Sequence, residues 1–266
     1  MTPPAPLADY LDAAQQAARL GAAALEEWRP RFRVHEKARF DLVTDADLAS
    51  QKTIADYLAR RYPGHAFLGE EDKSPHARPG PDAPPTWIVD PLDGTTNYVH
   101  DCPLYCVSIG LEVAGELVVG AVYEPTRDEM FHAAKGQGAW LNDRRLQTST
   151  TAKLDEALLA TGFPPDLRGQ ERALDWWRYF SLHAQSLRRT GSTALNLCWL
   201  AAGRFDGYWG FDNHVWDVAA GVVLVQEAGG KVTRADGSNL DAFQADLLAT
   251  NGLLHDQMTS TIRSVG

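Results

Sequence analysis

Two aspartates three residues apart could carry metal chemistry in this chain. Asp90 ends the apolar run 87–89, and Asp93 follows a proline and a leucine. Pro91 fixes the backbone and predicts a turn, which lets both carboxylates face one small volume. Their like charges need a counter-charge, and the neighbouring sequence offers no basic residue. A divalent cation such as Mg²⁺, which prefers carboxylate oxygens, is the expected partner.

The residues after Asp93 favour phosphate binding beside that cation. Gly94, Thr95 and Thr96 are typical of the start of a helix. The free backbone N–H groups of a helix start bind anions, and metals next to such a site suit phosphate ester hydrolysis. A simple surface turn is the alternative, because Asp-Pro and Asp-Gly pairs are common in turns.

Three further acids stand at the borders of predicted elements. Glu70 follows a short strand, Asp217 precedes a long apolar run, and Asp47 lies three residues after Thr44. Each has an ordinary alternative: a solvated turn for Glu70, a helix-dipole partner for Asp217 and a helix cap for Asp47. Borders of elements are also where ligands from different parts of a fold converge, so one shared site is our hypothesis.

Apolar periodicity predicts the elements that must position these acids. Helices are expected at residues 7–28, 45–61, 171–183, 193–202 and 216–228 and at the C-terminus. Strands are expected at residues 65–68, 87–89, 104–113, 117–124, 130–134, 158–161, 205–209 and 247–250. Residues 72–85, rich in proline, glycine and charge, indicate a surface loop.

This order of elements predicts a mixed α+β and α/β fold in two halves. Residues 1–148 are expected to form an N-terminal α+β half with an antiparallel sheet and the metal-binding motifs. Residues 149–266 are expected to form a C-terminal α/β half, packed closely against the first as one catalytic unit. A chain of 266 residues is long enough to bury such a core.

Composition narrows the functional classes. A formal net charge of −10 disfavours nucleic acid as a partner. No apolar run reaches the ~20 residues of a membrane span, and the N-terminus lacks the pattern of a secretory signal. Three cysteines give no disulfide framework and favour a cytoplasmic location. Buried thiols are the interpretation of Cys102 and Cys106, with a zinc site as the weaker alternative.

Five segments, in order along the chain, resemble the inositol monophosphatase family, within the wider group of metal-dependent, lithium-sensitive phosphatases. They are residues 41–47, 69–71, 90–100, 191–196 and 216–230. The resemblance implies a layered αβαβα sandwich of the inositol monophosphatase and fructose-1,6-bisphosphatase type. It also implies two to three Mg²⁺ ions, a homodimer, sensitivity to lithium and no phosphorylated enzyme intermediate.

The resemblance further implies a role for each matched residue. The metal ligands would be Glu70, Asp90, the carbonyl of Leu92, Asp93 and Asp217. Thr95, paired with Asp47, would orient and help deprotonate the attacking water, with Glu70 as a third catalytic residue beside the weakest ion. The substrate-binding residues would be Asp93, Gly94, Thr95, Ser192, Thr193 and His214. For His214 a purely structural hydrogen bond is equally open.

Inositol monophosphate is the substrate that the resemblance favours. Members acting on it carry a glutamate seven residues before the last metal-binding aspartate, whereas this chain has Gly210 there. Either Asp212 compensates or the substrate differs, and histidinol phosphate, fructose 1,6-bisphosphate and NADP are the alternatives. If the missing side chain alters specificity, Gly210→Glu should raise turnover of inositol phosphate. A non-catalytic regulatory or binding protein is the rival class, and retention of all the acids favours the enzyme.

Overall fold

The computed structural model describes the whole chain apart from residues 1–6, 73–79, 81, 165, 245 and 266. Most of the surface loop expected at residues 72–85 therefore lies outside the described residues. Among the helices that are described, none combines the length and the apolar character needed to cross a membrane.

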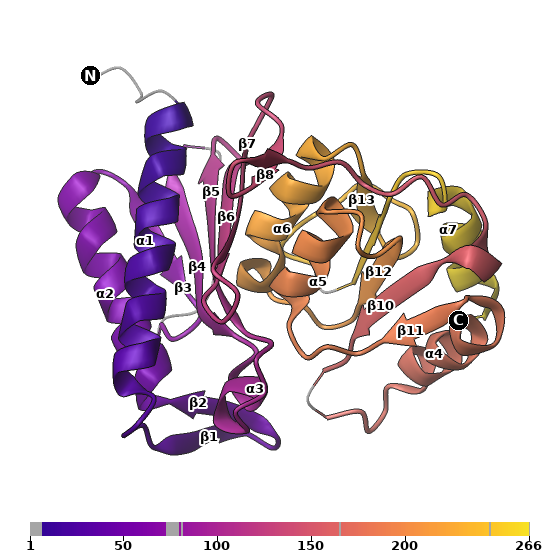
Figure 1. Ribbon diagram of the computed structural model, residues 1–266, viewed down its shortest axis with the longest axis horizontal. Helices are drawn as coiled ribbons and strands as arrows, with labels where there is room; N and C mark the ends of the chain where they lie inside the picture. The colour runs from indigo at the N-terminus through magenta and orange to yellow at the C-terminus, as the bar shows by residue number, and fades with distance from the viewer. Residues whose placement is uncertain (1–6, 73–79, 81, 165, 245, 266) are drawn as a thin grey trace.

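Two sheets and three layers of helices alternate through the molecule (Figure 1). Helices α1 and α2 cover the outer face of a seven-stranded sheet, α5 and α6 lie between the sheets, and α4 and α7 cover the outer face of a five-stranded sheet. The bounds of these helices are α1 Leu7–Trp28, α2 Asp45–Arg61, α4 Glu171–His183, α5 Thr193–Ala201, α6 Val215–Glu227 and α7 His255–Val265. The predicted αβαβα sandwich is confirmed.

The seven-stranded sheet has the order β3-β4-β5-β6-β7-β8-β9. Only β3 and β4 pair in parallel, and every later pair is antiparallel, which confirms the predicted meander. The strands are β3 Ala66–Gly69, β4 Thr86–Asp93, β5 Cys106–Val113, β6 Glu116–Glu124, β7 Glu129–Ala134, β8 Ala139–Leu141 and β9 Arg144–Arg145. Strands β4 and β5 are almost wholly buried, because helices cover both faces of the sheet at that point.

The five-stranded sheet has the order β11-β10-β12-β14-β13. Strand β10 runs parallel to both of its neighbours, whereas β14 is antiparallel to β12 and β13. The strands are β10 Leu158–Gly162, β11 Ser186–Arg188, β12 Gly207–Gly210, β13 Lys231–Arg234 and β14 Leu247–Thr250. This sheet comes wholly from residues after 148, although the division into halves at that point remains a prediction.

The expected turn at Pro91 is wrong in form, because β4 continues through the proline to Asp93. Asp90 lies opposite Ser108 of β5 and Asp93 lies opposite Cys106, so the strand carries a bulge between the two acids. A bulge tolerates proline, since the missing N–H removes no regular ladder bond there. The extra residue changes the direction of the side chains that follow it, and the strand continues to Asp93.

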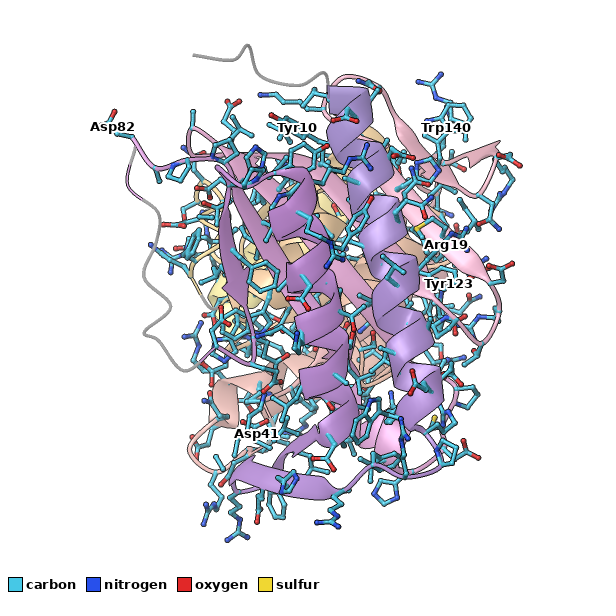
Figure 2. All side chains as sticks on the ribbon, turned by 90° about the vertical axis from the view of Figure 1, so that its left-hand side faces the viewer. Tyr10, Arg19, Asp41, Asp82, Tyr123 and Trp140 are labelled. Carbon is cyan, nitrogen blue, oxygen red and sulfur yellow. The ribbon has the colours of Figure 1, made fainter. Side chains whose placement is uncertain are left out.

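A small hairpin that the sequence did not predict lies below α1 and α2. It consists of β1 (Val34–Ala38) and β2 (Asp41–Thr44). Figure 2 shows α1 and α2 side by side on the outer face of the sheet, with Asp41 of the hairpin beneath α2. All five residues of β1 are exposed, so the strand has no apolar alternation from which it could be recognised.

Candidate metal and phosphate site

The last four residues of strand β4 contain both Asp90 and Asp93. Asp90 and Asp93 are 2% and 8% exposed, so both carboxylates are removed from bulk water. Asp90 Oδ1 accepts a hydrogen bond of 3.0 Å from the backbone N–H of Leu92, which lies within the bulge. The bulge thus places both carboxylates at the end of one buried strand.

The N-terminus of α5 binds the carboxylate of Asp93. The Ser192 hydroxyl donates to Asp93 Oδ2 at 2.7 Å, and the N–H of Ala194 donates to the same oxygen at 2.5 Å. The N–H of Thr193 donates to Oδ1 at 3.3 Å. A negative charge is stabilised at a helix N-terminus. Ser192 and Thr193, both expected near the substrate, therefore adjoin Asp93, and Ala194 is a neighbour that the sequence did not reveal.

Glu70 follows β3 and meets a lysine from the hairpin. Lys37 Nζ donates to Glu70 Oε1 at 2.8 Å and to Glu71 Oε1 at 2.6 Å. Nothing in the sequence indicated this pair, because Lys37 lies 33 residues from Glu70 along the chain. Burial lowers the pKa of Lys37, but Glu70 and Glu71 outweigh it and raise that pKa above its usual value.

Asp217 lies in the first turn of α6. Its Oδ2 accepts a 2.7 Å hydrogen bond from the backbone N–H of His214, which precedes the helix. The His214 ring is exposed and stacks on Trp216, with ring centroids 4.6 Å apart. The backbone of His214 thus has a structural role in holding Asp217, and its ring lies at the surface beside the acid.

Asp47 and Thr95 come together from α2 and α3 (Thr95–Val99). The buried Asp47 accepts hydrogen bonds through Oδ2 from the N–H of Thr44 at 2.9 Å and from its hydroxyl at 2.5 Å. Its other oxygen, Oδ1, lies 3.2 Å from the Thr95 hydroxyl, which also lies 3.1 Å from the carbonyl of Leu92. Asp47 therefore caps α2 and still presents one oxygen to Thr95.

Gly94 allows the chain to turn from β4 into α3. Its φ of 98° lies in the left-handed region that glycine adopts readily. A Cβ at this position would lie 2.8 Å from the carbonyl oxygen of Leu104. The predicted helix start after Gly94 is confirmed, with Thr95 as its first residue.

Burial and mutual repulsion disfavour ionisation of the acids. The pKa of Asp90 lies well above its usual value, first because of burial and then because of Glu70, Asp93 and Asp217. Burial, Glu70 and Asp93 raise the pKa of Asp217 in the same way. Burial raises the pKa of Asp93 to about 6, although Ser192 and the α5 N–H groups oppose the rise. The charge of Glu70 therefore raises the pKa of all three aspartates.

Three nearby acids also have raised pKa values. Burial raises the pKa of Asp47 to about 6, and burial with the charge of Glu70 raises that of Glu71 to about 7. Asp41 of the hairpin also has a raised pKa from burial, in an environment that includes Lys37, Glu70 and His214. Asp41 lies within one of the segments carrying the family resemblance, although no role was assigned to it from the sequence.

The donor set fits divalent cations. Carboxylates from the ends of β3 and β4 and the start of α6 repel one another in a buried volume, and Lys37 supplies only a single positive charge. Hard carboxylate oxygens are the ligands that Mg²⁺ prefers. As their side chains stand, no three His, Cys, Asp or Glu residues of the described chain enclose an ion. In the structure Glu70 accepts a hydrogen bond from Lys37, and Asp93 accepts hydrogen bonds from the start of α5.

One cysteine adjoins this site, since the Cys106 thiol lies 3.9 Å from Asp93 Oδ2. All three are free thiols, and Cys106 and Cys198 are fully buried. Within the described ranges, Cys102 and Cys106 belong to no group of metal-binding side chains. Cys106 is a buried thiol as expected, whereas Cys102 is only partly buried, so the interpretation is confirmed for Cys106 alone.

The fold and its acids define a class of phosphatase that hydrolyses phosphate monoesters, and the comparisons place the chain within it. The model of the inositol monophosphatase family matches residues 7–266. The chain belongs to the inositol monophosphatase family.

Individual relatives agree with this assignment. The chain is 42% identical to an inositol-1-monophosphatase of Synechocystis sp. over 97% of its own length and 90% of that protein. It is 40% identical to the Nus factor SuhB of Pseudomonas aeruginosa over 86% of each chain. The inositol monophosphatase of Anabaena (Nostoc) sp. superposes with a TM-score of 0.86 at 38% identity, covering 98% of this chain and 97% of that one.

Proposed function

We propose that the protein hydrolyses inositol monophosphate to inositol and phosphate with the help of Mg²⁺. The observation that carries the proposal is the buried group of acids from β3, β4 and α6, whose pKa values rise through burial and mutual repulsion. Cations would relieve that repulsion and attract a phosphate dianion to a protein of net charge −10.

The proposed metal ligands are Glu70, Asp90, the Leu92 carbonyl, Asp93 and Asp217, for two to three ions. Bound there, the ions would lower the pKa of a water molecule and neutralise charge on the departing alkoxide. The chain's own part is to bring these residues near one another and to shield them from bulk water, since Asp90, Leu92 and Asp93 are all at least 92% buried.

Proton transfer is assigned to Asp47 and Thr95. The Thr95 hydroxyl lies 3.2 Å from Asp47 Oδ1, so the threonine can accept a proton from water as its own proton passes to the carboxylate. Glu70 would assist as a third catalytic residue. The backbone N–H groups at Gly94 and Thr95 would bind the phosphate oxygens, because both lie at the start of α3.

The remaining substrate contacts surround Asp93. Ser192 and Thr193 would complete the pocket from the α5 side, and the exposed ring of His214 would border it from the α6 side. The name of the Synechocystis relative supports an inositol phosphate as substrate. Histidinol phosphate, fructose 1,6-bisphosphate and NADP remain the alternatives, since Gly210 offers no side chain to a substrate hydroxyl.

A second role has one specific observation in its favour, namely the 40% identity to a protein named as a Nus factor. A regulatory binding function would coexist with catalysis, because the acids proposed for catalysis are all present. We further propose that the protein is a cytoplasmic homodimer. Within each chain, residues 1–148 and 149–266 would form two closely packed halves.

The deciding experiment is phosphate release from inositol 1-phosphate, histidinol phosphate, fructose 1,6-bisphosphate and NADP, with Mg²⁺ and with a chelator. We expect magnesium-dependent release, fastest from inositol 1-phosphate and inhibited by millimolar lithium at limiting Mg²⁺. Asp93→Asn should be folded and inactive, whereas the exposed Asp143→Asn is the matched control. Equal phosphate release with Mg²⁺ and with the chelator would refute the metal assignment. No phosphate release from any of the four esters would favour the binding role.

A further inference from the structure

Two glycines on neighbouring strands make room for one tyrosine hydroxyl. Gly162 of β10 and Gly210 of β12 lie opposite each other in register. A Cβ on Gly210 would lie 2.5 Å from the Tyr208 hydroxyl oxygen, and a Cβ on Gly162 would lie 2.7 Å from it. Both distances are too short for real atoms. The paired glycines, which we name the glycine notch, therefore hold the end of the Tyr208 side chain.

The hydroxyl in the glycine notch joins two polar side chains. Tyr208 Oη lies 3.0 Å from Thr193 Oγ1 and makes a long hydrogen bond of 3.5 Å to Asn213 Oδ1. The same amide covers Gly210, since a Cβ there would lie 2.7 Å from Asn213 Nδ2. Asn213 thus occupies the space in which a side chain at position 210 would begin.

This polar group adjoins the acids of the candidate site. The backbone N–H of Thr193 donates to Asp93 while its hydroxyl meets Tyr208. Burial raises the pKa of Tyr208, the Thr193 hydrogen bond opposes the rise, and the nearby carboxylates of Asp217 and Asp93 add to it. Tyr208 is fully buried, whereas Thr193 and Asn213 are only partly buried, so these two side chains are the members that can reach a ligand.

Resting on the proposed phosphatase function, we propose that Asn213 contacts the leaving alcohol of the substrate and sets its specificity. Tyr208 is the positioning residue that holds Asn213 against the glycine notch, and Thr193 links Tyr208 to Asp93. An amide both donates and accepts hydrogen bonds, so it matches a hydroxyl next to the ester bond. The substrate class is therefore the phosphate ester of a polyhydroxylated alcohol.

The side chains of Asn213, Tyr208 and Thr193 form one wall of the proposed alcohol site, and the absence of charge on this wall has a consequence for specificity. Asn213, Tyr208 and Thr193 are uncharged, whereas a glutamate side chain at position 210 would be an anion. A neutral wall imposes no repulsion on an alcohol that bears a second phosphate. Asp212, the neighbour that could have compensated for Gly210, is exposed, and nothing in the glycine notch involves it.

Three substrates separate specificity from general damage to the enzyme. Inositol 1-phosphate has neighbouring hydroxyls, fructose 1,6-bisphosphate has a second phosphate, and p-nitrophenyl phosphate has neither. Asn213→Ala should raise KM for inositol 1-phosphate about three- to tenfold, as expected for one lost hydrogen bond. It should leave p-nitrophenyl phosphate nearly unchanged. Asn213→Asp should lower kcat/KM for the bisphosphate about tenfold relative to inositol 1-phosphate, because it places an anion in the wall.

Asp212→Asn is the matched control, because it changes the adjacent residue and asparagine tolerates the φ of 54° found there. It should leave all three substrates unchanged. Tyr208→Phe tests the positioning role: it should raise KM for inositol 1-phosphate in the natural sequence and have no further effect in the Asn213→Ala background.

The outcomes distinguish this inference from the function on which it rests. If the natural sequence hydrolyses the esters but the Asn213 variants affect all three substrates equally, the specificity role is overturned and the phosphatase function stands. If Asp212→Asn changes the substrate ranking instead, Asp212 is the specificity residue and Asn213 is not. If the natural sequence hydrolyses none of the three, the proposed function and the inference fall together.

Discussion

Lys37 Nζ lies 2.8 Å from Glu70 Oε1, so a lysine of the β1–β2 hairpin pairs with a proposed metal ligand. Both side chains are partly shielded, with 27% and 21% of their surfaces exposed. The same ammonium group also binds Glu71, whose side chain is only 5% exposed. Lys37 therefore provides a positive charge where the site is proposed to bind a cation, and the two cations would compete for Glu70.

Lys37→Met should make Mg²⁺ bind more tightly. Removal of the competing ammonium group should lower the Mg²⁺ concentration for half-maximal activity about two- to fivefold, the size expected for a partly exposed ion pair. Titration of activity with Mg²⁺ measures this. Lys135→Met, which removes the exposed pair with Glu116, is the control and should leave the titration unchanged. An unchanged or weaker Mg²⁺ requirement in Lys37→Met would show that the lysine does not compete.

Asp47→Asn should lower kcat about a hundredfold, because it removes the acceptor of the Thr95 proton. A base must be ionised, and burial raises the pKa of Asp47 to about 6. Activity of the natural sequence should therefore fall on the acid side, at or below that pH, since bound cations favour the ionised form. The acid limb should be absent from the pH profile of Asp47→Asn.

Asp45→Asn is the control for this variant, since it changes an acid in the same first turn of α2 that pairs with His35 rather than Thr95. It should retain both the rate and the acid limb. Persistence of the limb in Asp47→Asn would assign it to another group.

Stabilisation by Mg²⁺ should depend on pH. Folded-state pKa values of Asp93 and Glu71 are raised to about 6 and about 7, so without metal these groups lower stability as pH rises from about 4 to 7. Cations bind the ionised carboxylates and remove that loss. The rise in melting temperature on adding Mg²⁺ should therefore be larger at about pH 7.5 than at about pH 5.5.

The difference between melts with and without Mg²⁺ isolates this effect. Burial lowers the pKa of His255 to about 4, so His255 weakens the fold as pH falls from about 6.5 to 4, but it does so in both melts and cancels. Asp93→Asn should reduce the pH dependence of the Mg²⁺ effect. Equal stabilisation by Mg²⁺ at both pH values would contradict the raised pKa values of the acids.

Gly210→Ala should destabilise the protein by about 1–3 kcal/mol, the usual cost of overpacking. The new Cβ would meet the Tyr208 hydroxyl at 2.5 Å, and Tyr208→Phe in the same chain should restore part of the loss. Urea unfolding measures both. Gly64→Ala, where nothing lies within 4 Å of the new Cβ, is the control. No loss in Gly210→Ala would show that Tyr208 and Asn213 move aside easily.

This crowding also changes an expectation drawn from the sequence. A glutamate at position 210 would need to displace the end of Tyr208 and the Asn213 amide before it could contact a substrate. Gly210→Glu should therefore raise inositol phosphate turnover only if that rearrangement occurs. The sequence showed which side chain was missing, but it could not show what fills its place.

Much of the fold could be predicted because long apolar patterns determine it. The helix at Glu171–His183 was predicted at its exact bounds, and the meander from β5 to β7 followed from alternating runs. The short strands β8, β9 and β11 have two or three residues each, too few for a period to be recognised. The end of β4 was misjudged because proline usually breaks a ladder, whereas here it lies in a bulge.

Some residues of the candidate site could be predicted from the sequence, and others could not. Asp90 and Asp93 are close in sequence, so their shared position could be inferred directly. Lys37 could not be found, because an exposed lysine 33 residues from Glu70 has nothing to mark it. The Tyr208 contacts depend on strand register between Gly162 and Gly210, which apolar periodicity does not specify.

The contact between Asp93 and the start of α5 also bears on how the protein is made. Ser192 and Ala194 follow Asp93 by 99 and 101 residues, and Asp217 comes later still. A ribosome therefore exposes Asp90 and Asp93 long before it has synthesised the residues that enclose them. During that interval the growing chain carries acids without the partners of the finished site. Hydrolytic activity can therefore appear only after α6 has been synthesised and the start of α5 has packed against Asp93.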